Sequence, residues 1–218
     1  MTSQIFYSYT VAAFVVLTSI LMLRRSQASN GQQPATKPHL LASVPPEQLP
    51  TYIQSLLAEL PSCVILQADV VAFQQAIDYS WAQQNREIIP ACIVRPRDAQ
   101  QLGKAVAILK REHDSRSQAG GQIAGFFAVR SGGANPGLGA ATVQDGVVID
   151  LSLFCEVTPA VDGSTVTVGT GAKWIDVYKA LDEKGLIVMG GRSSPVGVGG
   201  LTLQGKIVTD LRLSEGEF

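Results

Sequence analysis

The sequence predicts a mixed α and β fold. Segments with helical periodicity alternate with short apolar runs that are typical of strands, and Asp162–Gly163 provides a hairpin-like turn. Eighteen of the 21 glycines fall between Gly120 and Gly205, so this region needs backbone positions without side chains. With 46% apolar residues, the 218-residue chain can bury the core of an ordinary domain. A disordered or collagen-like chain is therefore excluded.

Charge and metal-ligand content exclude further classes of protein. The formal net charge is -1, whereas a nucleic-acid-binding protein needs a basic face that neutralises phosphates. Two histidines and three scattered cysteines do not form a set of ligands spaced for a structural zinc site. We therefore predict no metal and no nucleic acid as partners.

The N-terminus carries an apolar segment, Ile5–Leu23, with 15 apolar residues of 19 and no charge. This length suits a transmembrane helix, and Arg24 and Arg25 directly after it favour an uncleaved anchor. Ser26–Ala28, however, fits the small-x-small pattern of a signal-peptide cleavage site. We therefore expect residues 1–25 to be a signal peptide or a membrane anchor. Either would direct a secreted or membrane-anchored chain to the secretory pathway, with 26–44 as a polar linker.

The regular elements follow this linker. Pro45 and Pro46 are placed to open the first helix, Asp98 to cap the third, and Gly185 to end the last in a left-handed conformation. The expected helices cover residues 49–60, 70–84, 99–110 and 174–181, and the expected strands cover 91–94, 126–130, 147–151, 165–168 and 186–189.

Two glycine clusters lie at the ends of these strands. The strand FFAVRS leads into a glycine-rich turn over residues 132–139, and a second cluster covers residues 190–191 and 197–200. Such turns can point several amide N–H groups at one anion, such as a diphosphate. Either cluster alone is also compatible with an ordinary turn between strands. The G-x-G-x-x-G fingerprint and the Walker pattern are absent, so neither a Rossmann nor a P-loop domain is predicted.

Five ordered blocks together resemble one family: PACIVRPRDAQQLGKAVAIL, FFAVRSGGANPGLG, GVVIDLS, VTVGTGAKWIDVYKALDEKGL and GGRSSPVGVGGLTLQG. They are similar to the FAD-binding PCMH-type domain of the vanillyl-alcohol-oxidase type, and nearest to the berberine-bridge-enzyme-like, oxygen-dependent FAD-linked oxidoreductases. The resemblance implies an α+β fold, a mixed sheet with flanking helices, over residues 91–205. Residues 45–90 would form an N-terminal helical extension.

The resemblance also implies a cofactor site. The loop that matches Arg130–Asn135 would wrap the FAD diphosphate, and the loop that matches Pro195–Leu201 would lie along the cofactor. The expected FAD contacts are Arg130, Ser131, Gly132, Gly133, Ala134, Asn135, Gly197, Val198, Gly199, Gly200 and Leu201. The resemblance further implies a disulfide between Cys63 and Cys92, whereas spacing alone leaves reduced cysteines equally open.

Two features depart from the family pattern. Many members read R-S-G-G-H in the first loop and bind the flavin covalently through that histidine, but this chain has Ala134 there. We therefore expect any FAD to be held non-covalently. After Leu203 the chain continues into residues 206–218, which resemble nothing in the family. We therefore expect the domain to be incomplete at its C-terminus and the substrate domain to be missing.

The function expected from the resemblance is flavin-dependent oxidation of a small organic substrate, by hydride transfer to FAD and reoxidation by oxygen. The alternative is a catalytically inactive remnant, secreted or membrane-tethered. No catalytic residue is predicted. Asp150 is expected to have a structural role, Trp174 and Tyr178 to pack in a core, and Lys173 and Arg192 to be solvated surface charges.

Overall fold

The computed structural model describes residues 45–118 and 125–204, all within one compact unit, Leu40–Phe218. The apolar segment 5–23, the linker 26–44 and the tail 206–218 lie outside the described residues. None of the helices in the described ranges has both the length and the hydropathy that a membrane span requires.

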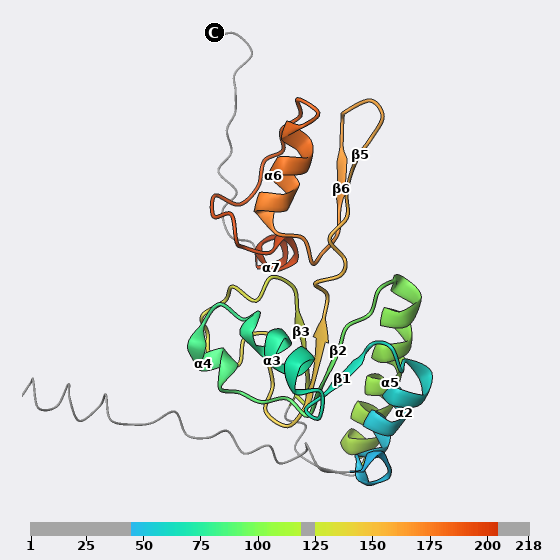
Figure 1. Cartoon of the computed structure of the whole chain (residues 1–218). Coiled ribbons are helices and arrows are strands. Elements are labelled where there is room, and N and C mark those ends of the chain that lie inside the picture. The colour runs from blue at the N-terminus through green and yellow to red at the C-terminus, as the bar shows by residue number, and fades with distance from the viewer. Residues whose placement is uncertain (1–44, 119–124, 205–218) are drawn as a thin grey trace, which may run out of the picture. The chain divides into compact units, whose positions relative to one another are not determined.

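The chain combines helices and short strands, as the sequence predicts, with β3 to β6 following one another between α5 and α6 (Figure 1). The helical elements are η1 (Pro46–Gln48), α2 (Thr51–Glu59), α3 (Val70–Asp78), α4 (Gln83–Arg86), α5 (Ala99–Gln118), α6 (Trp174–Asp182) and α7 (Val198–Leu203). The strands are β1 (Val64–Leu66), β2 (Cys92–Val94), β3 (Phe127–Arg130), β4 (Val147–Asp150), β5 (Val157–Pro159) and β6 (Val166–Val168).

A four-stranded mixed sheet forms the centre, in the order β1-β2-β4-β3. β1 is antiparallel to β2, whereas β2, β4 and β3 run parallel. β2 and β4 are central and buried on both faces, which explains why both are apolar except for Asp150 at the end of β4. Their side chains alternate: one set packs with α2 and α5, and the other packs with α3 on the opposite face (Figure 1). The first set is Cys92, Val94, Val147 and Ile149, and the second is Ile93 and Val148.

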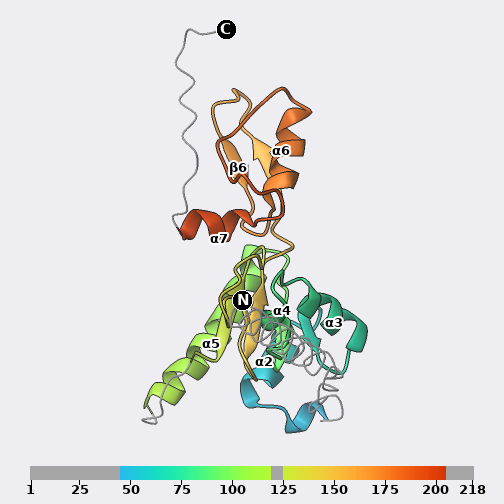
Figure 2. The same cartoon turned by 90° about the vertical axis from the view of Figure 1, so that its left-hand side faces the viewer.

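Two of the local helix signals are confirmed, but the first is not: α2 begins at Thr51 after Pro50, and Pro46 instead opens the short 3-10 helix η1. Asp98 accepts a hydrogen bond from the Gln101 amide at 2.8 Å and so caps the start of α5, which runs on to Gln118, beyond the expected end. Gly185, which follows the C-cap Glu183 of α6 by two residues, has a φ of 65°, the left-handed conformation expected there. α6 packs against the hairpin β5–β6 through Trp174, Val177 and their neighbours (Figure 2).

Three local predictions differ from the structure. The expected helix 70–84 is split into α3 and α4, because the Trp81 amide donates to the Gly133 carbonyl at 2.9 Å instead of continuing the helix. Residues 186–189 are not a strand, since they pair with no strand among the described residues and Ile187 is 86% exposed. β1 was not predicted and lies within the expected helical extension, where its pairing with β2 makes it part of the central sheet.

Candidate functional site

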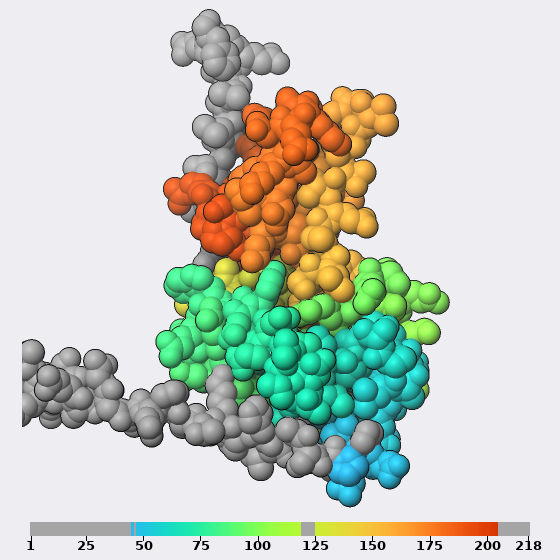
Figure 3. Space-filling model, viewed as in Figure 1, coloured from blue at the N-terminus to red at the C-terminus, as the bar shows by residue number. Residues whose placement is uncertain are grey.

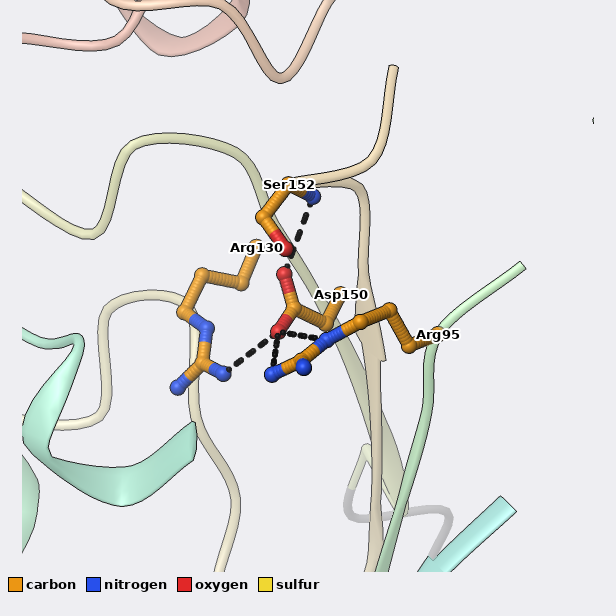
Figure 4. Close-up of polar contacts among 4 residues, drawn as sticks. All are labelled: Arg95, Arg130, Asp150 and Ser152. Atoms are coloured by element: carbon orange, nitrogen blue, oxygen red, sulfur yellow. Dashed lines mark hydrogen bonds and ion pairs between the residues drawn. The ribbon is translucent and has the colours of Figure 1, made fainter. Parts of the chain in front are cut away.

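A buried ion cluster fixes the end of β3. Arg130 is the last residue of β3 and lies opposite Asp150 in the β3–β4 register; its Nη2 atom is 3.0 Å from Asp150 Oδ2. Arg95 donates to the same oxygen at 3.0 and 3.1 Å, and the Ser152 amide donates to Oδ1 at 3.0 Å (Figure 4). Asp150 is 0% exposed and Arg130 is 1% exposed. Asp150 therefore has the structural role that the sequence predicts.

The cluster carries an excess of positive charge. Burial alone would raise the pKa of Asp150, but the Arg130 charge, the hydrogen bond from Ser152 and the Arg95 charge more than offset burial and lower this pKa. Asp150 is therefore ionised at neutral pH. Two guanidinium groups share this one carboxylate, so one positive charge is left uncompensated behind the loop that follows β3.

Tyr79 lies between this cluster and a second cation. The Arg130 guanidinium carbon is 5.4 Å from the centroid of the Tyr79 ring, and Lys173 Nζ is 4.6 Å from the same centroid. Tyr79 carries no sequence signal of a functional role. It follows α3, and the residues that it contacts are far away along the chain, so no local pattern indicates its position.

The glycine-rich loop after β3 is held through its carbonyl groups. The Gly133 carbonyl accepts from the Trp81 amide at 2.9 Å, the Asn135 carbonyl from Asn85 Nδ2 at 3.0 Å, and the Pro136 carbonyl from Gln84 Nε2 at 2.7 Å. In addition, the Gly139 amide donates to Asn85 Oδ1 at 3.0 Å. The donors lie on or just before α4, which covers the loop from one side: only a few yellow atoms of the loop are visible behind the green residues in Figure 3.

The amide groups of the same loop are left free. Within the described part of the chain, no acceptor binds the backbone N–H groups of residues 131–135. The N–H and C=O groups of a trans peptide unit point in opposite directions, so the Ala134 amide points away from Trp81, to which the Gly133 carbonyl is bound. Gly133 has a φ of 63°, a left-handed conformation that side chains disfavour, and such turns bring successive amides to one side.

The second glycine cluster meets the first. A Cβ atom on Gly132 would lie 2.4 Å from the Cα of Gly197, so the two backbones touch. A Cβ atom on Gly199 would lie 2.7 Å from the Thr170 carbonyl. Val198 and Leu201 pack against the apolar cluster of Trp174, whereas Gly200 has open space around it. The structure therefore brings Gly132 and Gly133 together with Gly197 and Gly199.

The polar side chains of the two loops are engaged locally. Ser131 Oγ donates to the Thr170 carbonyl at 2.6 Å, and Asn135 Oδ1 accepts from the Gly137 amide at 2.9 Å. Half-buried Ala134 contributes only a methyl group at the position expected for a covalent flavin link. The loop therefore offers its main chain, rather than its side chains, to a ligand.

The aromatic residues of α6 pack as expected. The rings of Trp174 and Tyr178 stack at 5.7 Å, and Tyr178 donates to the Gly191 carbonyl at 2.8 Å. A Cβ atom on Gly190 would lie 2.1 Å from the Trp174 ring, so glycine is required there. Arg192 is exposed, as predicted, whereas Lys173 is half-buried and lies over Tyr79. The expectation that Lys173 is a solvated surface charge is therefore corrected.

The expected disulfide between Cys63 and Cys92 is not formed in the structure. Both cysteines are buried free thiols, and Cys63 Sγ lies 3.2 Å from Gln101 Oε1. The β1–β2 register continues to Cys63, whose carbonyl accepts from the Arg95 amide at 2.8 Å. Arg95 is therefore the residue opposite Cys63. Cys92 lies three residues away from Arg95 along the same strand, which corresponds to about 10 Å at strand spacing. A disulfide requires Cα atoms within about 7 Å.

The loop residues fit the diphosphate of FAD. Glycine positions that no side chain could occupy let the main chain approach closely, the free amides provide donors, and the uncompensated charge of the ion cluster favours an anion. The two glycine loops are therefore suited to an anionic group such as a diphosphate. No group of three or more histidine, cysteine, aspartate or glutamate residues that could hold a metal ion occurs among residues 45–118 and 125–204.

The chain belongs to the FAD-binding domain family, because the model of that family matches residues 90–210. Its fold is that of the PCMH-type, berberine-bridge-enzyme-like flavoproteins. It is 31% identical over 148 residues to an uncharacterized FAD-linked oxidoreductase of Arthroderma benhamiae, a match that covers 65% of this chain and 28% of the relative. It is 37% identical over 128 residues to the FAD-dependent monooxygenase macF of Penicillium terrestre, with 58% and 22% covered.

Solved structures agree with this assignment. 6-Hydroxy-D-nicotine oxidase from Arthrobacter nicotinovorans superposes with a TM-score of 0.51 at 30% identity, over 63% of this chain and 27% of that one. Physcomitrella patens BBE-like 1 shares the fold with a TM-score of 0.54 at 24% identity, over 71% and 30%. The chain spans about a quarter of the length of the curated relatives that it matches.

Proposed function

We propose that this chain binds FAD non-covalently and holds the diphosphate on the backbone amides of residues 131–135. The strongest support is the difference between the two kinds of backbone group in the loop. Residues on and just before α4 donate hydrogen bonds to its carbonyl groups, whereas its amide groups have no acceptor among the described residues. Arg130, behind the loop, contributes positive charge while it remains ion-paired with Asp150. The second loop, with Gly197, Val198, Gly199, Gly200 and Leu201, is proposed to line the cofactor from the other side.

The absence of a histidine at position 134 supports the non-covalent mode. The methyl group of Ala134 has no atom that could attack the flavin ring. Two of the three cysteines, Cys63 and Cys92, offer no substitute, because they are buried in the core between the sheet, α2 and α5. Burial raises the pKa of Cys92 to about 12, so this thiol is also unreactive at neutral pH.

The proposed activity is that of an FAD-linked oxidoreductase, which the FAD-linked and FAD-dependent relatives support. The cofactor would supply the redox chemistry, accepting a hydride from a small organic substrate and passing the two electrons to dioxygen, which with two protons gives hydrogen peroxide. The residues described here bind and orient it. The loop amides hold the diphosphate in one register, and the contact between Gly132 and Gly197 keeps the two loops together.

Ligand binding by the full chain tests this proposal. We would titrate the chain, purified in mild detergent, with FAD, ADP and riboflavin, and follow flavin fluorescence and heat of binding. Because the proposed site is for the diphosphate, FAD and ADP should bind and compete, whereas riboflavin, which has no phosphate, should bind far more weakly. Acid precipitation should then release all flavin into the supernatant.

Two results would contradict the proposal. Flavin that stays with the acid-precipitated protein would disprove non-covalent binding. A chain with a cooperative unfolding transition that binds neither FAD nor ADP would disprove the diphosphate site and favour a remnant without cofactor.

A further inference from the structure

Lys173 lies where the two glycine loops meet. It forms an isolated antiparallel bridge with Gly197, whose backbone touches Gly132. Its Nζ atom lies 4.6 Å from the centre of the Tyr79 ring. Tyr79 in turn contacts the first loop: a Cβ atom on Gly133 would be 3.3 Å from its carbonyl oxygen and 3.5 Å from its ring. Both the main chain and the side chain of Lys173 therefore border the loop that carries the free amides.

The ammonium group of Lys173 has no anionic partner in the described part of the chain. An ammonium group has three N–H donors, yet here it makes no ion pair or hydrogen bond with another described residue. The nearest acidic residue in sequence, Asp176, is exposed on the first turn of α6; its charge acts on Tyr79, but it forms no ion pair with Lys173. The aromatic ring attracts the cation but leaves its donors free.

The groups near Tyr79 carry a net positive charge that suits an anion, even when exposed Asp176, whose charge also acts on Tyr79, is counted. Arg95 and Arg130 share the single carboxylate of Asp150, which leaves one positive charge, and Lys173 adds a second on the same ring. Arg130 is buried and held by Asp150, so its charge acts on a ligand only through the electric field. Lys173 is half-buried on a flexible side chain, so it can reach a ligand directly.

We propose that Lys173 is a direct cofactor-contacting residue, which binds the FAD diphosphate with its ammonium group while the Tyr79 ring holds its side chain over the loop. This inference rests on the proposed diphosphate site and adds to it the residue that neutralises the ligand. A solvated surface lysine would contribute nothing measurable to affinity, whereas a charge-assisted hydrogen bond to phosphate contributes about tenfold or more.

The test compares Lys173→Gln with Lys173→Arg and with Lys184→Gln, a matched control at an exposed lysine just after α6. Dissociation constants for FAD and ADP would be measured at low and high ionic strength, together with the melting temperature of each variant without ligand. We expect Lys173→Gln to weaken both ligands about tenfold and to reduce the salt dependence of binding. Lys173→Arg should retain most of the affinity and Lys184→Gln all of it. The melting temperatures should change only slightly, because the single cation–π contact of Lys173 with Tyr79 contributes little to stability.

The role of Tyr79 is tested with Tyr79→Phe and Tyr79→Leu. The phenylalanine variant keeps the aromatic face and should bind FAD like the wild type, whereas the leucine variant should lose part of the contribution of Lys173. If Lys173→Gln binds FAD and ADP as tightly as the wild type at low salt, Lys173 does not contact the diphosphate. That result would leave the proposed diphosphate site on the loop amides intact. If the folded wild-type chain binds neither ligand, both proposals fail together.

Discussion

The backbones of Gly132 and Gly197 lie in direct contact, so that a Cβ atom on either glycine would be 2.4 to 2.5 Å from the Cα of the other. The atoms that such a Cβ would meet are main-chain Cα atoms, which cannot move aside as the end of a flexible side chain can. The contact joins the loop after β3 to the segment that opens α7. Neither glycine can therefore be replaced without displacing one of the two proposed cofactor loops.

We predict that Gly132→Ala lowers the free energy of unfolding by about 1–3 kcal/mol, the usual cost of overpacking, and weakens FAD binding. Urea unfolding and FAD titration would measure both effects. Gly103→Ala is the control, because it lies inside α5 with no atom within 4 Å of an added Cβ. That variant should gain about 0.5–1 kcal/mol, since alanine favours the helix. Equal stability of both variants would show that the loops separate easily.

Asn85 positions the glycine loop through two hydrogen bonds, to the Asn135 carbonyl and from the Gly139 amide. Because Asn85 is 2% exposed, Asn85→Ala leaves buried polar groups without partners, and we expect a loss of about 1–3 kcal/mol in unfolding free energy. FAD affinity should fall as well, since the amides lose their fixed direction.

Gln74→Ala is the control for the Asn85 variant. It removes an exposed hydrogen bond to Asp78 within α3 and should change the unfolding free energy by less than about 0.5 kcal/mol. An Asn85→Ala variant with wild-type FAD affinity would rule out a positioning role for Asn85.

Asp150 makes stability depend on pH in the acid range. Its folded-state pKa is lowered from the ordinary value of 3.8, so its contribution to stability is present above that value and is lost as the pH falls through the lowered pKa. We expect Asp150→Asn to be less stable at neutral pH by about 3–5 kcal/mol, because two arginines lose their counter-charge. Its unfolding free energy should change less than that of the wild type between about pH 5 and pH 2. Chemical unfolding of both proteins across this pH range measures this difference. If the unfolding free energies of the wild type and the variant change in parallel with pH, Asp150 is not the group responsible.

The three cysteines should differ in reactivity. Cys155 is exposed, whereas Cys63 and Cys92 are buried and the pKa of Cys92 is raised to about 12 by burial. Maleimide labelling of the native chain, read by mass spectrometry, should modify Cys155 alone. After denaturation without a reductant, all three should react. A single modified cysteine under denaturing conditions would instead demonstrate the disulfide that the family resemblance implies.

Local sequence signals predicted much of the fold but little of what surrounds the loop. The apolar runs of β2 and β4, the cap at Asp98 and the left-handed Gly185 depend on neighbouring residues, and all appear in the structure. The two glycine clusters are also visible in the sequence, and the structure brings them together. Tyr79 has no such signal, because its role depends on residues that are distant in the sequence.

The errors have the same physical origin. Residues 70–84 have the composition of one helix, yet a tertiary hydrogen bond from Trp81 to Gly133 outweighs helix propensity there. Residues 186–189 have apolar side chains typical of a strand but find no partner strand among the described residues. Short strands such as β1 carry too few residues for a periodic pattern to be recognised.

The hydrogen bonds of Asn85 also bear on where this domain can be cut and joined. The family match begins at residue 90, but Tyr79, Asn85 and β1 all lie before it and contribute to the loop or to the sheet. A chimera that transplants residues 90–210 into a relative would therefore carry the glycine loop without the residues that orient it. Recombination partners should exchange the chain from β1 onward, so that the loop and the helix that holds it are inherited together.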